Sequence, residues 1–187
     1  NTVLENNVSK ETLERFSTGA LGDALNSLSG VSSLNKGNGI VKPIVNGLHS
    51  SRIIMINNGV RMQDQEWGAE HAPNIDVNSV GRLTLVKSAG ALQYGGDAMG
   101  GVIIAEALKV PVKDSLYGKT MSSLTSNGRD GVLTSTLTKS YANGWYGTAQ
   151  GSLKRFGDFE AADYILSNTG IIEQNASLRL GLYKFNY

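Results

Sequence analysis

The sequence of 187 residues contains no cysteine, which excludes disulfide scaffolds, cysteine-ligated metals and thiol nucleophiles. Acidic and basic residues nearly cancel, and the formal net charge of +1 gives no electrostatic reason to expect a nucleic-acid partner. No apolar run approaches the roughly 18–20 residues that a membrane-spanning helix needs. The first residues carry neither an initiator methionine nor a signal peptide, which indicates a processed or truncated chain.

Glycine is abundant, with 23 residues, whereas there are only 3 prolines. This combination suits tight turns between strands better than it suits disorder, which usually brings both residue types. The length allows one ordinary domain, or a small domain followed by a fragment of another.

The N-terminal half predicts short helices followed by short strands. Ser9 is a weak helix cap, and the spacing of leucines predicts a short helix over residues 20–28 that ends at Ser29-Gly30. Strands are predicted over residues 40–45, 53–56, 60–62, 83–86 and 102–105. Pro43 assigns the first of these to a sheet edge, and the apolar run from Ile53 predicts a strand buried on both faces.

The pattern changes after about Ser115, where apolar and polar residues alternate over stretches of roughly 9–11 residues, long enough for a strand to cross a bilayer. The apolar faces hold Leu133, Leu137, Trp145, Ala149, Leu153, Leu178 and Leu180. The opposite faces hold Thr134, Thr136, Thr138, Thr148, Gln150, Ser177 and Arg179. Turn signals at Asn127-Gly128 and Asn143-Gly144, and a longer loop over residues 157–170, separate the stretches.

An ordinary half-exposed sheet would show the same alternation, and the pattern alone leaves that alternative open. Two details favour a membrane barrel. Aromatic residues such as Tyr141 and Trp145 stand near strand ends, as in interfacial girdles, and the connecting loops alternate between short and longer.

A series of motifs covers about half of the chain. In order they are Leu21-Gly-Asp-Ala-Leu25 with Leu28-Ser-Gly-Val-Ser32, Asn46-Gly47-Leu48, Asn57-Asn58-Gly59-Val60, His71-Ala72-Pro73, Arg82-Leu-Thr-Leu-Val-Lys87, and Tyr94-Gly-Gly-Asp-Ala98 with Gly100-Gly101-Val102. Each motif is weak alone, but together and in this order they resemble the plug domain of TonB-dependent outer-membrane receptors. Residues 68–76 and 90–98 resemble receptors of Bacteroidetes-type bacteria.

The resemblance implies a fold in two parts. Residues 1–110 would form an α+β plug domain, a small mixed sheet with short helices. Residues 111–187 would form the first antiparallel strands of a transmembrane β-barrel. A plugged transporter barrel has about 22 strands, so the chain would cover only part of one.

The resemblance also implies a function, which is active transport of a scarce nutrient across the bacterial outer membrane, with the plug gating the barrel lumen. The implied partners are the TonB-ExbB-ExbD energising complex, outer-membrane lipid, and a small-molecule or metal-chelate substrate. An iron-siderophore or similar metal chelate is the commonest cargo in the family, while cobalamin, haem and glycans stay open. No TonB box is recognisable in the sequence.

The densest polar and aromatic segment begins at Gln63 and ends at His71, and the resemblance makes it the apical plug loop that touches substrate. The candidate binding residues are Gln63, Asp64, Gln65, Glu66, Trp67, Glu70 and His71. Trp67 would stack on a flat ligand, and the glutamines and His71 would hydrogen-bond to it. A solvated loop without a binding role explains the same composition.

Arginines of the family's plug can pair with barrel-wall carboxylates and so latch the plug. In this sequence the implied latch consists of Arg52, Arg82 and Lys87. Asn46 and Lys87 stand where the family more often has arginine, and a lysine does not replace the bidentate pairing of a guanidinium.

No catalytic residue, cofactor or metal site is predicted. Glu70 and His71 are adjacent and point apart on a regular element, and no zinc-type spacing or Ser-His-Asp order occurs. The segment from Tyr94 to Asp97 lacks the lysine and the strand–loop–helix setting of a P-loop, so it is predicted to be a turn. The alternative to a transporter is a soluble, secreted, β-rich ligand-binding module, which would stay soluble without detergent.

Overall fold

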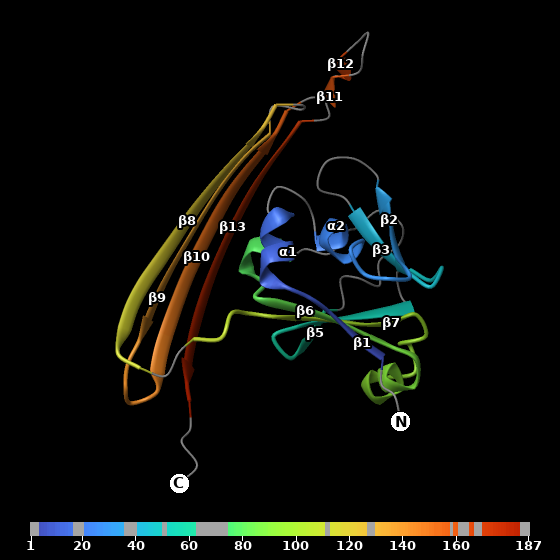
Figure 1. The fold of residues 1–187 in the computed structure, drawn as a ribbon, viewed down its shortest axis with the longest axis horizontal. Helices are drawn as coiled ribbons and strands as arrows, with labels where there is room; N and C mark the ends of the chain where they lie inside the picture. Colours follow the sequence, from blue (N-terminus) through green and yellow to red (C-terminus); the bar gives the residue numbers. More distant parts are fainter. Residues whose placement is uncertain are drawn as a thin grey trace. The chain divides into compact units, whose positions relative to one another are not determined.

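The computed structural model describes residues 4–16, 21–35, 41–49, 52–62, 75–110, 113–126, 130–157, 159–160, 165–166 and 170–183. The chain divides into two compact units, Asn1–Leu108 and Lys109–Tyr187. Each unit has a principal sheet of its own (Figure 1).

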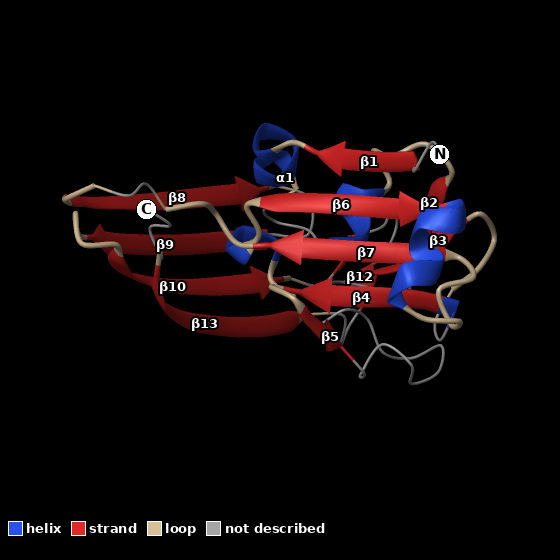
Figure 2. Cartoon of the chain, turned by 90° about the horizontal axis from the view of Figure 1, so that it is seen from below, coloured by secondary structure: helices blue, strands red, loops and turns tan. Residues whose placement is uncertain are grey.

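The first unit is a mixed α+β structure, as the sequence predicts. Its strands are β1 (Leu4–Val8), β2 (Val31–Asn35), β3 (Val41–Val45), β4 (Ile53–Asn57), β5 (Val60–Met62), β6 (Arg82–Lys87) and β7 (Gly101–Glu106). Its helices are α1 (Lys10–Arg15), α2 (Leu21–Leu25) and the 3-10 helices η3 (Val77–Ser79) and η4 (Ser88–Tyr94). Five strands form one sheet in the order β1-β6-β7-β4-β5, seen in Figure 2, and β2 pairs with β3 in a separate ribbon.

The centre of the five-stranded sheet is a parallel pair, β4 with β7, whose register runs from Ile53 opposite Gly101 to Asn57 opposite Ala105. The other neighbours in this sheet pair antiparallel. The first three residues of β4 are all buried, which confirms the predicted strand with two covered faces. Gly101 has a φ of 139°, and a Cβ there would lie 2.9 Å from the carbonyl oxygen of Val86, so glycine lets β7 begin beside β6.

Two separate apolar clusters cover the two faces of this sheet. The larger cluster includes Met55, Leu83, Leu85 and Ile103 from the strands, with Leu13, Leu21 and Leu25 from the helices. The smaller cluster includes Ile54, Val86 and Val102 from the strands, with Ala91 of η4 and Ala98 of the turn after it. The alternating residues of the central strands therefore all have apolar partners, and the sheet is buried on both sides.

The helices differ in one respect from the prediction. Ser9 caps α1, and its hydroxyl accepts a hydrogen bond from the backbone N–H of Thr12 at 3.3 Å. Hydrogen bonds from its own backbone N–H and from Ser9 lower the pKa of Glu11 in the first turn. The second helix ends at Leu25 rather than Leu28, because the next residues bond to carbonyls three positions back and tighten the chain into a turn.

The second unit contains four long strands, β8 (Ser115–Thr125), β9 (Asp130–Ser140), β10 (Trp145–Phe156) and β13 (Ile171–Leu182). They pair antiparallel in the order β13-β10-β9-β8 and lie side by side in a curved sheet (Figure 1). The loop that the sequence predicts over residues 157–170 holds a small hairpin of β11 (Phe159–Glu160) and β12 (Ile165–Leu166).

The two faces of the long sheet have the predicted composition. Leu137, Ala149 and Leu178 stand in one cross-strand row, because Ala149 is paired with the other two. The exposed apolar residues of these strands include Leu116, Leu124, Leu133, Leu137, Leu153, Ile172, Leu178 and Leu180. The opposite face is held by polar cross-strand pairs: Thr138 with Thr148 and Gln150 with Ser177, each at 3.0 Å, and Lys154 with Glu173 at 3.5 Å.

Among the described residues, no helix combines the length and the apolar character that crossing a membrane requires.

The chain that follows β7 packs closely against Gly81, just before β6. The N–H of Gly81 donates to the carbonyl oxygen of Glu106 at 2.8 Å. A Cβ at Gly81 would lie 2.6 Å from the backbone N and Cα atoms of Leu108, closer than a side chain can approach a backbone. The chain after β7 therefore packs against the start of β6 only because residue 81 has no side chain.

We expect Gly81→Ala to lower the free energy of local unfolding of β6 and β7 by about 1–3 kcal/mol, because the methyl group forces Leu108 away. Hydrogen exchange of the β6 and β7 amides in the complete protein measures this. Gly96→Ala is the matched control, since a Cβ there meets nothing within 4 Å. Equal exchange rates in the two variants would contradict the close-packing argument.

Candidate functional site

The residues of the predicted substrate loop lie outside the described residues: Gln63, Asp64, Gln65, Glu66, Trp67, Glu70 and His71. Its two flanks are described. Met62, at the end of β5, is partly buried and packs against the larger apolar cluster. Ile75, on the other flank, is a buried member of the same cluster. Both ends of the segment are therefore held by the core of the first unit.

An ion pair joins the β5 flank to the glycine-rich motif before β7. The Nη2 atom of Arg61 lies 3.2 Å from Oδ2 of Asp97. Tyr94 ends η4, and the predicted turn follows it up to Asp97, with a φ of 136° at Gly95. Asp97 is well exposed, so the pair contributes less than about 1 kcal/mol to stability. The pair links strand β5 to the turn before β7.

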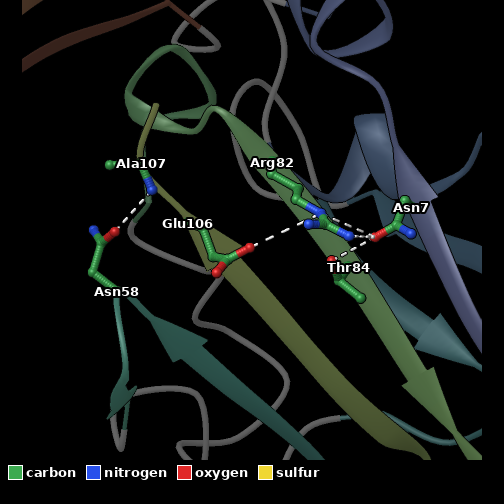
Figure 3. A network of polar contacts seen from close by, with 6 residues as sticks. All are labelled: Asn7, Asn58, Arg82, Thr84, Glu106 and Ala107. Carbon is green, nitrogen blue, oxygen red and sulfur yellow. Dashed lines mark hydrogen bonds and ion pairs between the residues drawn. The ribbon is translucent and has the colours of Figure 1, made fainter. Parts of the chain in front are cut away.

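A polar network crosses three strands at one end of the sheet (Figure 3). The Oδ1 atom of Asn7 on β1 accepts hydrogen bonds from Thr84 Oγ1 at 2.7 Å and from Arg82 Nε and Nη2 at 3.4 and 3.3 Å. Arg82 also lies 4.0 Å from Glu106 on β7. Because β1 is an edge strand that pairs only with β6 in this sheet, Asn7 adds a side-chain link to the outermost ladder.

The three predicted latch residues do not come together. Arg82 begins β6 and Lys87 ends it, so they lie at opposite ends of the strand. Arg52 is on the same end of the sheet as Lys87, because Ile53 is paired with Gly101 and Val86 with Val102. Lys87 is 9% exposed, and its ammonium group donates to the carbonyl oxygen of Ser29. A pairing of these side chains with a barrel wall stays a prediction.

Asn7 and Asn58 are polar residues that the sequence did not single out for their contacts. Asn58, with a φ of 49° in the predicted Asn-Asn-Gly turn, accepts a hydrogen bond from the N–H of Ala107 at 2.8 Å (Figure 3). The sequence therefore predicted the turn at Asn58, but it did not predict the hydrogen bond from Ala107. The sequence gave no indication of the contacts of Asn7, because an asparagine in a strand matches neither strand propensity nor a motif.

No cluster of three or more potential metal ligands occurs within the described ranges.

Comparison with known proteins shows which family the chain is similar to. The model of the TonB-dependent Receptor Plug Domain matches residues 2–102. The Vitamin B12 transporter BtuB of Photobacterium profundum is 29% identical over 97 residues, which cover 51% of this chain and 16% of that protein. The family match therefore takes in Asn7, Arg82 and Thr84 of the polar network and the segment from Gln63 to His71.

Solved structures share the fold at low identity. A hemophore receptor HasR of Serratia marcescens, solved with its hemophore HasA and heme, aligns with a TM-score of 0.80 and 17% identity, over 95% of this chain and 29% of that one. The siderophore receptor PirA of Acinetobacter baumannii aligns with a TM-score of 0.74 and 13% identity, over 97% of this chain and 29% of that one. The chain spans less than a third of the length of each of these relatives.

We expect Asn7→Ala to loosen β1 selectively. The substitution removes the acceptor of Arg82 and of the mostly buried Thr84 hydroxyl, so the free energy of opening the β1–β6 ladder should fall by about 1–2 kcal/mol. Hydrogen exchange of the amides in β1 reports the change, while β4 and β7 should keep their rates. Glu5→Ala is the control, because Glu5 is exposed on the same strand and has no polar side-chain contact with another described residue. The interpretation is wrong if both variants exchange alike.

Proposed function

The chain belongs to the TonB-dependent receptors through its plug domain, and on this basis we propose that the complete protein is an active transporter of the bacterial outer membrane. Residues 1–110 form the plug that gates the lumen, and residues 111–187 form the first strands of the barrel wall. The relatives in the comparison are named as transporters and receptors rather than enzymes, and we propose no catalytic step.

The observation that carries this proposal is the order of the two units in one chain. A plug-type sheet is followed directly by antiparallel strands of 11 or 12 residues with one exposed apolar face. In hydrocarbon every backbone polar group needs a partner, and strands meet this requirement when they close into a barrel. A soluble binding module gives no reason for a plug and wall-length strands to occur together, so we do not favour it.

Opening in this proposal begins at the N-terminal edge of the plug. TonB, energised by ExbB-ExbD, draws on the segment before β1, and the outermost ladder is the first to yield. Asn7 then sets part of the resistance, because its three hydrogen bonds have to break with that ladder. The latch of Arg52, Arg82 and Lys87 on wall carboxylates is the second restraint. Lys87 joins it only by leaving the carbonyl oxygen of Ser29.

The substrate that we propose is a metal chelate, with an iron-siderophore first. The names of the relatives refer to vitamin B12, to a heme-carrying hemophore and to a siderophore. These ligands share a metal bound in an organic chelator, and several present a flat or aromatic surface. Trp67 is suited to stack on such a surface, while Gln63, Gln65 and His71 are suited to hydrogen-bond to its rim.

Uptake in living cells tests the transport proposal. A strain that lacks its own siderophore receptors is given the complete protein and supplied with radiolabelled ferric siderophores, haem and cobalamin in turn. We expect at least one chelate to accumulate, and only in cells with functional TonB. Accumulation that is the same without TonB, or binding without any accumulation, would contradict the proposal.

We expect Trp67→Ala to weaken binding of the transported chelate by about tenfold or more, because a stacking aromatic surface is lost from the site. Equilibrium binding to the purified complete protein in detergent measures the effect. Trp145→Ala is the control, since Trp145 stands at the start of β10 in the other unit, outside the proposed loop. Unchanged affinity in Trp67→Ala would remove this loop from the binding site.

A further inference from the structure

The apolar face of the long sheet carries charged residues only near its two ends. Strand alternation and register place Lys139 of β9 and Arg155 of β10 on the face that holds Leu137, and the other residues of the four described strands on this face are uncharged. Lys139 is paired with Gly147, eight residues before Arg155 on β10. Eight residues extend about 26 Å, or about 20 Å across a bilayer for a strand tilted by about 40°. This is close to the roughly 25 Å height of the apolar band of such strands, so both cations lie near the level of the lipid head groups.

Two aromatic residues lie beside Lys139 at this end of the sheet. Tyr141 follows Lys139 by two positions, and its N–H donates to the carbonyl oxygen of Trp145 at 2.8 Å. Both aromatic side chains are about half exposed. The turn that carries them is held by the chain after β13, because the N–H of Tyr183 donates to the carbonyl oxygen of Gly144 at 3.0 Å. The two rings are therefore presented together at a fixed edge of the apolar face.

Lys139 makes an ion pair next to these rings. Its ammonium lies 4.7 Å from the centroid of the Tyr141 ring and 3.1 Å from Oδ1 of Asp114. The linker residues Lys113 and Asp114 come just before β8, and the buried Ser140 hydroxyl donates to the carbonyl oxygen of Lys113 at 2.7 Å. The side chains of Lys139 and Asp114 are 40% and 66% exposed, so each can take a further partner. We call Asp114, Lys139, Tyr141 and Trp145 the interfacial patch.

The interfacial patch offers one charge of each sign together with two ring faces. A purely anionic ligand would be repelled by Asp114, and a purely cationic one by Lys139, whereas a ligand that carries both charges matches both residues. A phosphate oxygen accepts hydrogen bonds from a lysine ammonium. A primary ammonium donates to a carboxylate and is also attracted to the face of an aromatic ring. The exchange of the Lys139–Asp114 pair for two pairs with such a ligand sacrifices little, because exposed ion pairs contribute little.

The interfacial patch borders directly on exposed leucines. Lys139 is paired with Leu116 of β8 and with Gly147 of β10, and Gly147 is in turn paired with Leu180 of β13. Leu116 and Leu180 are both well exposed. A ligand with acyl chains could lay them along these leucines while its head group occupies the patch. A small soluble zwitterion would leave the leucines uncovered, so the continuity of the patch with the apolar face favours a lipid.

We propose that the interfacial patch binds the head group of a zwitterionic phospholipid that carries a primary amine, the phosphoethanolamine group. The phosphate lies on Lys139, and the ammonium lies on Asp114 and over the rings of Tyr141 and Trp145. The acyl chains follow the leucines of the apolar face. This site lies outside the proposed substrate loop, so the inference goes beyond the proposed transport function and does not depend on uptake.

The test measures lipid binding to the complete protein in detergent by native mass spectrometry. Phosphatidylethanolamine, phosphatidylcholine and phosphatidylglycerol with identical acyl chains are titrated in turn, and the dissociation constant of the first bound lipid is compared. We expect wild type to bind phosphatidylethanolamine about fivefold more tightly than the other two lipids. Lys139→Gln should weaken binding of phosphatidylethanolamine by about fivefold, the effect of one exposed ion pair. Asp114→Asn should weaken it by a similar factor and strengthen binding of phosphatidylglycerol, because the repulsion of its phosphate is removed.

Lys119→Gln is the matched control, because Lys119 is an exposed lysine of β8 that is paired with Thr136 on the opposite, polar face. We expect it to bind all three lipids as wild type does. Equal affinity of Lys139→Gln and Lys119→Gln for phosphatidylethanolamine overturns the site. A wild-type preference for phosphatidylglycerol overturns the pairing with both charges, and equally tight binding of phosphoethanolamine without acyl chains overturns the assignment to a lipid. Far-UV circular dichroism and thermal unfolding of each variant separate a lost site from a lost fold.

Discussion

The parallel pairing of β4 with β7 is the interaction on which the first unit depends. It places Ile54 and Val102 on one face and Met55 and Ile103 on the other, so each of the two apolar clusters contains side chains from both strands. Parallel neighbours need a long connection, and here it includes the loop with Trp67 and strand β6. The proposed binding loop therefore lies within this connection, between Met62 at the end of the mostly exposed β5 and the buried Ile75.

The sequence predicted the elements whose residues repeat a simple pattern. The apolar run at Ile53, the turn at Asn58 and the alternation from Leu133 to Leu137 all occur as expected. Strand β1 was missed, because its Leu-Glu-Asn-Asn-Val run has poor strand propensity and forms by pairing with Thr84 and its neighbours. Contacts between distant residues, such as those of Asn7 and Tyr183, depend on tertiary geometry and leave no local signal.

The two units hold their polar groups in different ways. In the plug the side-chain network at Asn7 lies on an edge strand, where the hydrogen bonds from Arg82 are exposed and the one from Thr84 is partly buried. In the second unit the polar face of the long sheet carries buried groups such as Ser140 and Lys154, whose partners are cross-strand or linker atoms. The polar groups that link the long strands are therefore better sheltered from water than those that link β1 to β6.

The antiparallel order of the four long strands also has a consequence of parity. Strand β8 begins at Ser115 beside Ser140, and β13 finishes at Leu182 beside Trp145, with the tight turn after Ser140 between them. After an even number of antiparallel strands, the chain is back at the end of the sheet at which the first strand began. Strand β13 therefore ends at the same end of the long sheet as that at which β8 begins.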